Sequence, residues 1–311
     1  MEFCGQKNIV AFLKRQLDPE KRLIQSLLFF GPEHLGKATL AYIFSQSLIC
    51  EKKVWSGCGK CPSCRAYLKN FHPDVKILSN EDQEKSLIIE QARLSSEFLS
   101  YKPQLASLKI LIIDGAENLT FEAQSAFLKI LEEPPQQSLI ILISSQIDRL
   151  LLTVRSRLLP LRFQSVANEE ISVWLNKEKI NPAEMEKAIS YGLNKPGLIK
   201  KYLIDPSCYK KSQDARNNLD RILQSGFADK SRILEQIIKK EGSLDFNLKE
   251  WLQLGRENML SEIFKNQNQT DTLNISLNDK IKLLKELTRA QSLLEQYNLN
   301  TRLLMENIFL A

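Results

Sequence analysis

The sequence has no run of apolar residues that approaches the roughly 18 needed to span a bilayer as a helix. Its first ten residues, MEFCGQKNIV, also lack the basic stretch followed by an apolar run that marks a secretory signal. These two absences argue against a membrane protein and against a secreted one. We therefore expect a cytoplasmic protein, and its 311 residues suggest two or three domains.

The excess of basic over acidic residues is also small. The chain carries 43 Lys and Arg against 37 Asp and Glu, which gives a net charge of +6. Basic and acidic residues are interspersed, and no long basic run occurs. This charge is compatible with a nucleic acid nearby, but taken alone it is weak evidence.

Cysteines are few and unevenly distributed. Four of the six fall in the pattern CxxxxxxxCxxCxxC: Cys50, Cys58, Cys61 and Cys64. A secreted disulfide framework would spread its cysteines along the chain. Zinc prefers four thiolates in a tetrahedron, which overlapping CxxC turns supply, and Gly57 and Gly59 permit the bends. We predict a zinc site made of these four cysteines.

Three other interpretations of the cysteines stay open. The first is four reduced core cysteines, although GCGKCPSC is polar and glycine-rich. The second is a redox CxxC pair, which needs a thioredoxin-like setting, and the third is an iron–sulfur cluster. His72, in FHPD, lies close by, but with four cysteines present we interpret it as a capping or packing histidine.

The first half of the chain contains four apolar runs that predict buried strands: residues 26–30, 74–79, 109–114 and 139–145. Such runs, separated by helical patterns, predict an α/β fold in which a parallel sheet has helices on both faces. Strand signals fade after about residue 165. Short helical patterns follow around Pro196 and Gly197, and helical patterns continue from residue 208 onward.

The last helical pattern has one apolar face. Leu284, Leu287, Leu294 and Tyr297 recur at helical spacing, so this face requires a core or a partner helix. The polar stretch at 265–278 is typical of a loop.

The stretch GPEHLGKATL, residues 31–40, differs from a phosphate loop at one position. In the template GxxxxGK[ST], glycines let backbone N–H groups surround phosphates, the lysine neutralises charge and the hydroxyl holds magnesium. Gly31, Gly36 and Lys37 match, but Ala38 replaces the hydroxyl residue. We predict a degenerate phosphate loop.

The second nucleotide-site signal is Asp114, at the end of ILIID. A hydrolytic site would place an acidic residue directly after it to orient the attacking water, and Gly115 stands there instead. Asp114 alone retains the capacity to hold a metal. Because two independent positions lack the side chains that hydrolysis needs, we expect no ATP turnover. Binding of ATP without turnover stays open.

A third signal is the pair of arginines in TVRSR. Arg155 and Arg157 flank Ser156 at the end of a short helical pattern. Spacing alone favours salt-bridged surface arginines. The alternative is an arginine finger, which stabilises charge on the γ-phosphate bound by a neighbouring subunit.

Several stretches together resemble the delta prime family of bacterial DNA polymerase III clamp-loader subunits, within the AAA+ superfamily. They are GQKNIVAFLKRQL, the phosphate-loop region, the four cysteines followed by HPD, IIDGAENLTFEAQSAFLKILEEPP, SSQIDRLLLTVRSR, LNKPGLIKKYL and NTRLLMENIFL. The likeness covers nearly the whole chain. It implies an AAA+ domain over 1–165 with a zinc-binding insertion at about 50–75, a helical lid over 166–207, and an all-α collar for oligomerisation over 208–311.

The resemblance also implies a function. The chain would be a non-hydrolysing stator that donates Arg157 in trans to an ATPase subunit while a sliding clamp is loaded onto primed DNA. Arg157 occupies the position of the family's Ser-Arg-Cys arginine finger, with Leu158 in place of the cysteine. The implied partners are the gamma or tau ATPase subunits, the delta subunit, the sliding clamp and, through the complex, primed DNA. Zinc is implied as a structural ion.

Two alternatives come from other functional classes. One is a motor ATPase of the gamma or tau type, against which Ala38 and Gly115 count. The other is a zinc-ribbon module that binds nucleic acid, with the AAA+ core as a scaffold. It predicts tight, salt-dependent DNA binding by the isolated chain, and the sequence shows no basic cluster around the cysteines.

Overall fold

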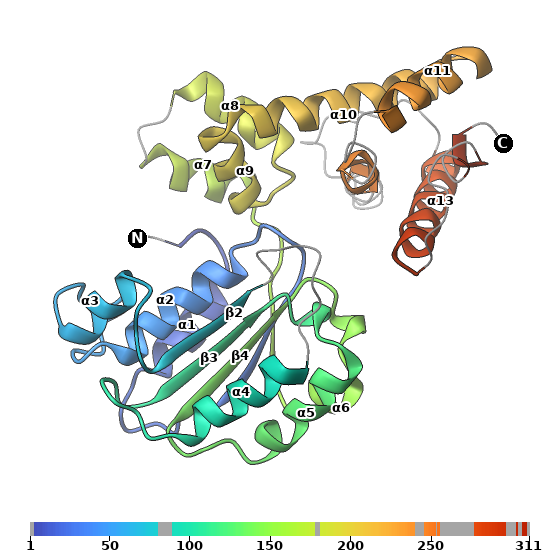
Figure 1. The fold of residues 1–311 in the computed structure, drawn as a ribbon. Coiled ribbons are helices and arrows are strands. Elements are labelled where there is room, and N and C mark those ends of the chain that lie inside the picture. Colours follow the sequence, from blue (N-terminus) through green and yellow to red (C-terminus); the bar gives the residue numbers. More distant parts are fainter. Residues whose placement is uncertain are drawn as a thin grey trace. The chain divides into compact units, whose positions relative to one another are not determined.

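The computed structural model describes residues 3–79, 89–177, 181–239, 246–252, 254–255, 277–296, 303 and 307–309. The chain divides into two compact units, Met1–Lys200 and Lys201–Ala311, so the boundary falls within helix α9 (Pro196–Ile204). Each unit has its own hydrophobic core. The backbone of both units can be followed in Figure 1. Among the described helices, none is both long and apolar enough to cross a membrane.

A five-stranded parallel sheet forms the centre of the first unit. Its strands, in spatial order, are β2 (Val75–Ser79), β3 (Lys109–Asp114), β4 (Ser138–Ser144), β1 (Ser26–Phe30) and β5 (Leu159–Arg162). Every neighbouring pair is parallel; Leu28, for example, is in register with Leu142 on one side and Pro160 on the other. The predicted parallel sheet and its four predicted strands are confirmed.

The fifth strand, β5, was not predicted. It has only four residues, LPLR, and Pro160 has no backbone N–H to donate, so such a segment pairs only at the edge of a sheet. β5 occupies one edge of the sheet and, among the described strands, pairs with β1 alone. From this edge the chain runs on to residues 163–167.

Helices cover both faces of the sheet (Figure 1). The first face is covered by α1 (Lys7–Arg15) and α2 (Lys37–Ile49), and the second by α4 (Ile89–Ser100), α5 (Phe121–Glu132) and α6 (Leu152–Arg155). Successive strand residues alternate between two apolar layers: Ile110 and Ile112 lie in the first, Leu111 and Ile113 in the second. Burial on both faces explains why these strands are apolar throughout.

The remaining elements of the first unit are short. They are α3 (Pro62–Leu68), the 3-10 turns η1 (Ala116–Asn118) and η2 (Ile147–Arg149), α7 (Asn168–Asn176), α8 (Pro182–Tyr191) and the start of α9. The segment after the sheet is joined to these last helices, because Val166 donates its backbone N–H to the carbonyl of Asn194 at 2.9 Å. The helices α7 to α9 lie where the lid was predicted, and the predicted domain boundaries stay a prediction.

The described part of the second unit is helical. Its elements are α10 (Pro206–Gln224), α11 (Phe227–Lys239), the helical residues 246–252 and α13 (Leu277–Gln296). Trp251 is fully buried in its core and donates its indole N–H to the carbonyl of Ala215 at 2.7 Å.

The apolar face of α13 contributes to that core. Leu287 is buried in it and Leu284 packs against it. This face is therefore at least partly covered within the unit itself. The side chain of Leu294, Tyr297 and most of the predicted loop at 265–278 lie outside the described residues.

Candidate functional site

The phosphate-loop stretch lies between β1 and α2, the strand–loop–helix setting that the motif requires. α2 begins at Lys37, and Gly36 before it has a φ of 81°. Gly31 has a φ of 138°, and a Cβ there would lie 2.4 Å from the carbonyl oxygen of Phe163. Both positions therefore favour glycine for its backbone conformation, and Gly31 also permits the close approach of the segment that follows β5.

Lys37 is directed at the loop's own backbone. Its Nζ donates to the carbonyl oxygens of Gly31 and Pro32, each at 2.7 Å. Burial lowers the pKa of Lys37, and nearby carboxylates, chiefly that of Glu117, oppose this shift. The next residue, Ala38, has no hydroxyl, and its side chain packs against the apolar core. The loop offers a buried lysine to an anion but lacks the side chain that would hold magnesium.

The acidic part of the site has a single carboxylate at the end of β3. Asp114 is the last residue of that strand, and Gly115 follows with a φ of 77°. Burial raises the pKa of Asp114, and the charge of Lys37 opposes the rise. The left-handed backbone at Gly115 disfavours any side chain there, a carboxylate included. Position 115, whose side chain would orient an attacking water, therefore has no carboxylate, and its backbone conformation disfavours one.

Glu117 was not predicted as a site residue, and the structure fixes it beside the loop. Its Oε1 accepts hydrogen bonds from the backbone N–H of Ser145, at 3.0 Å, and from the Ser145 hydroxyl. Its charge acts on both Lys37 and Asp114. These two contacts of Ser145 hold Glu117 in place from the residue that follows β4.

Lys195, directly before α9, was also missed. It is buried, and its positive charge contributes to the lowered pKa of Lys37, so the two ammonium groups share one neighbourhood. Two residues on, Gly197 donates its backbone N–H to the carbonyl of His34 in the loop at 2.9 Å. A Cβ at Gly197 would lie 2.7 Å from that oxygen. The Pro–Gly pair was the only sequence signal here, and nothing in it indicated the distant loop.

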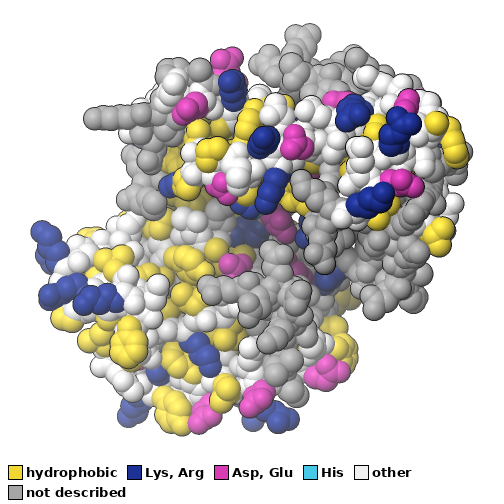
Figure 2. All heavy atoms as spheres, turned by 45° about the horizontal axis from the view of Figure 1, so that its top comes forward, with side chains coloured by type: hydrophobic (Ala, Val, Ile, Leu, Met, Phe, Trp, Pro, Cys, Tyr) yellow, Lys and Arg dark blue, Asp and Glu magenta, His cyan; other side chains and the backbone are white. Residues whose placement is uncertain are grey.

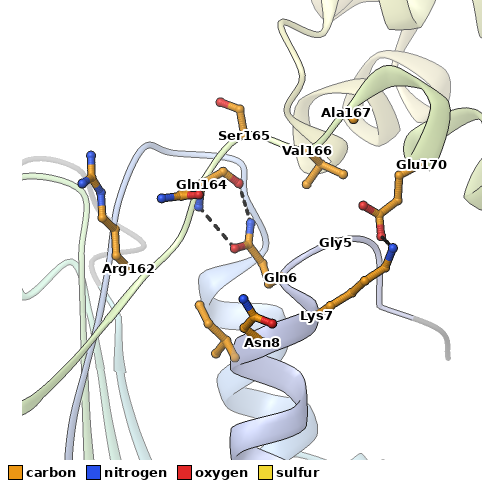
Figure 3. Close-up of a pocket in the computed structure, with 11 residues that line it drawn as sticks. Gly5, Gln6, Lys7, Asn8, Arg162, Gln164, Ser165, Val166, Ala167 and Glu170 are labelled. Carbon is orange, nitrogen blue, oxygen red and sulfur yellow. Dashed lines mark hydrogen bonds and ion pairs between the residues drawn. The ribbon is translucent and has the colours of Figure 1, made fainter.

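A cavity of about 440 Å³ lies beside the start of α1 (Figure 3). Residues 5–9 line it together with residues from the connection between β5 and α7. Gln6 joins these two walls, because its side chain donates to the carbonyl of Gln164 and accepts from the backbone N–H of the same residue. Lys7 and Glu170 form an ion pair at 3.1 Å. No motif in the sequence indicated this cavity.

Arg157 lies two residues beyond α6, on the surface of the first unit. Its guanidinium donates to the carbonyl of Thr153 at 2.6 Å and pairs with the carboxylate of Glu132. The two charged side chains are 31% and 49% exposed. Arg155 forms a separate pair with Asp148 at 3.6 Å. Both arginines thus have acidic partners within the chain, as the surface interpretation predicts, and Arg157 remains accessible.

The four predicted cysteine ligands come together in space. Their Sγ atoms all lie within 4.8 Å of one another, and those of Cys58 and Cys64 are 4.0 Å apart. A zinc–sulfur bond of about 2.3 Å in a tetrahedron requires sulfur atoms nearly this close. Backbone N–H groups of Lys60 and Cys61 lower the pKa of the Cys58 thiol to about 6, whereas burial raises the pKa of the Cys64 thiol to about 12, so the convergence of the four sulfur atoms is the stronger indication of a metal site. The donor set fits a structural zinc ion.

The surroundings of the cysteines fit the same interpretation. Gly57 has a φ of 69°, and a Cβ there would lie 2.9 Å from the Sγ of Cys64, so a side chain would intrude on the ligands. His72 is bonded elsewhere: its Nε2 lies 2.7 Å from the hydroxyl of Ser63 and its Nδ1 accepts the backbone N–H of Asp74. This agrees with the packing role predicted for His72.

Comparisons with known proteins identify related sequences. The family model described as DNA polymerase III, delta subunit, matches residues 5–167. DNA polymerase III subunit delta' of Pseudomonas aeruginosa is 34% identical over 143 residues, 46% of this chain and 44% of that protein. Subunit gamma of Buchnera aphidicola is 30% identical over 196 residues, 61% of this chain and 53% of that protein. The matches span about half the length of these curated relatives.

Among solved structures, a gamma subunit-related protein of Thermotoga maritima aligns over 97% of each chain at 21% identity, with a TM-score of 0.49. The family assignment depends on the family model, which covers more than half of the sequence, and on the relatives named delta'. The chain belongs to the DNA polymerase III delta-subunit family, among the subunits named delta'.

Proposed function

We propose that the chain is a clamp-loader subunit of DNA polymerase III that takes part in loading the sliding clamp without hydrolysing ATP itself. The observation that carries this proposal is the state of the phosphate site. Lys37 and the loop glycines stand in the setting of an ATPase, while Ala38 and the left-handed Gly115 occupy the two positions that hydrolysis needs. A site of this kind has a structural role and can at most bind an anion.

The gamma relative motivates the alternative of a motor ATPase. ATP turnover by the isolated chain distinguishes the two. We expect no turnover above background, because neither the magnesium-binding hydroxyl nor the water-orienting carboxylate is present. Hydrolysis that disappears with Lys37→Ala would contradict the proposal, since Lys37 is the loop's own phosphate-binding group.

Within the complex, this chain would contribute Arg157 to the ATP site of a neighbouring subunit. An arginine that acts on a neighbour's nucleotide must be exposed and must be able to leave its resting contacts. Arg157 is partly exposed, and its pair with Glu132 is of the surface type, which contributes about 1 kcal/mol or less. Exchanging Glu132 for the γ-phosphate of a neighbouring subunit's ATP would therefore cost little. The proposed partners are the gamma or tau subunits, the delta subunit, the clamp and primed DNA.

The zinc ion has a structural role in this proposal. Cys50, Cys58, Cys61 and Cys64 would hold it with no open coordination position, so it would act as a folding cross-link and supply no catalytic chemistry.

A further inference from the structure

Phe71 is the most exposed large apolar side chain among the described residues, with 85% of its surface accessible. It lies three residues beyond the end of α3, and Asn70 before it has a φ of 55°. The backbone N–H of Asn70 donates to Tyr67 at 2.9 Å, and that of Phe71 donates to Ala66 at 3.0 Å. This is a Schellman ending, in which the residue at this position commonly folds back onto the helix. Here the ring is exposed to solvent, and the two backbone hydrogen bonds fix the position of its Cα.

The short helix beneath Phe71 is firmly attached to the unit. The Tyr67 hydroxyl donates to the carbonyl of Tyr42 in α2 at 3.1 Å. Cys64 is fully buried, and its backbone N–H donates to the Sγ of Cys61, which caps the helix. Phe71 is thus an aromatic ring on a preorganised support, and a ligand that binds it pays little ordering entropy.

The exposed charges of the segment that carries this ring are mostly basic. Four exposed basic residues share the cysteine module, residues 50–71: Lys52, Lys60, Arg65 and Lys69. The one acidic residue of that segment is Glu51. Within the described part of the chain, none of the four bases forms an ion pair, whereas Lys7, Lys21 and Arg155 do. At the left edge of Figure 2, the side on which Figure 1 shows α3, dark blue side chains gather beside yellow ones.

This basic surface was not evident in the sequence. The four bases are separated from one another by several residues, so no run stands out. Each nevertheless lies within five residues of a cysteine of the cluster. Because the four Sγ atoms converge, the fold brings these bases onto one small module.

We propose that the cysteine module is a binding surface for single-stranded nucleic acid, with Phe71 as a stacking platform and the four bases as phosphate contacts. A protein partner would need adjoining apolar side chains to bury. Here Phe71 and Leu68, which is 62% exposed, stand at the end of a seven-residue helix among cationic groups. A flexible polyanion with accessible base faces matches both the charge and the lone ring. A duplex offers no unstacked base.

The test is fluorescence anisotropy of a short labelled oligothymidylate with the full, zinc-loaded chain, at low and at physiological salt. We expect binding that weakens as salt rises. Phe71→Ala should weaken it about tenfold, the effect of losing one stacked base. The double variant Arg65→Glu, Lys69→Glu should weaken it further and reduce the salt dependence. Zinc content is measured for each variant, so that a misfolded module is recognised.

Matched controls separate this surface from general charge and exposure. Phe121→Ala removes another exposed ring, and the double variant Lys21→Glu, Arg22→Glu changes the net charge equally outside residues 50–71. Both should bind like the parent chain. The proposal is overturned if the parent chain does not bind at low salt, or if the controls lose as much affinity as the module variants. It is also overturned if a phenylalanine-containing polyglutamate peptide binds through Phe71 while oligothymidylate does not. Since no partner subunit or ATP is needed, these outcomes are independent of the proposed clamp-loader role.

Discussion

At the scale of single residues, burial decides what each charged pair contributes. Asp74 and Lys109 are both buried, with Oδ1 and Nζ 3.4 Å apart, and Asp74 also accepts backbone N–H groups of residues 104–106. Burial alone raises the pKa of Asp74, but these hydrogen bonds and Lys109 outweigh it and hold the pKa below its ordinary value. Arg157 and Glu132 are partly exposed, so their pair contributes little to folding.

Asp74→Ala should therefore destabilise the first unit by about 3–5 kcal/mol at neutral pH, because Lys109 would be left buried and unpaired. The contribution of Asp74 is fully present above the unfolded pKa of a carboxyl group, about 4, and is lost as the pH falls through the lower folded pKa. Denaturant unfolding at several pH values measures this, and the gap to the parent chain should narrow below about pH 4.

Asp18→Ala is the control, because its pair with Lys21 is exposed and spans 3.7 Å. It should change the free energy of unfolding by about 0.5 kcal/mol or less. Equal effects of the two substitutions would show that burial does not set the contribution of Asp74.

At the scale of elements, we expect the stability of α3 to depend on the cysteines. It has seven residues, too few to be stable alone, and it begins at Cys61 and Pro62. Bound zinc would cross-link its first turn to the end of α2 through Cys50. The helix and the loop before it should therefore lose their order together when the metal is removed.

Elemental analysis should find one zinc per chain, and Cys61→Ala should reduce this to near zero. A structural zinc ion contributes apparent binding energies of about 10–16 kcal/mol in small modules. Amide exchange in residues 50–71 should therefore accelerate while the sheet residues 109–114 stay protected. Cys208→Ala, outside the cluster, should keep its zinc. Metal-free protein from a reducing, chelator-free purification would contradict the prediction of a zinc site.

Elements with strong local patterns were predictable from the sequence, and contacts between distant segments were not. β1 and β3 were predicted with the observed bounds because buried parallel strands are apolar throughout. The cysteine cluster was predictable because its ligand spacing is local. β5 was missed because a four-residue strand with a proline has no period to detect. Lys195 was missed because only the fold brings it to the phosphate loop.

At the scale of the whole molecule, the chain consists of two units with separate cores. The first unit is organised around the sheet, and the second around Trp251 and Leu287. A unit with its own core can fold alone. We propose that residues 208–311, which make up most of the second unit, mediate oligomerisation, as the resemblance to clamp-loader subunits implies.

Deleting residues 208–311 should accordingly leave a folded, zinc-binding fragment that no longer associates with the gamma or tau and delta subunits. Size-exclusion chromatography of mixtures checks association, and circular dichroism checks the fold of the fragment alone. Co-elution of the truncated chain at the affinity of the full chain would remove the collar assignment.

The DNA- and clamp-stimulated ATPase of the reconstituted complex measures whether this subunit acts on a neighbour's ATP through Arg157, as we propose. We predict that Arg157→Ala lowers this rate without changing assembly, and that Arg157→Lys restores little, since an ammonium lacks the planar fork of donors. The loss should be smaller than the full effect of an arginine finger, about 10³ to 10⁵, because this subunit would border one of several ATP sites. Glu132→Ala breaks the same internal pair from its other side, and Arg155→Ala removes the neighbouring arginine; both should keep the parent rate. A parent rate with Arg157→Ala, or an equal loss in either control, would contradict the account.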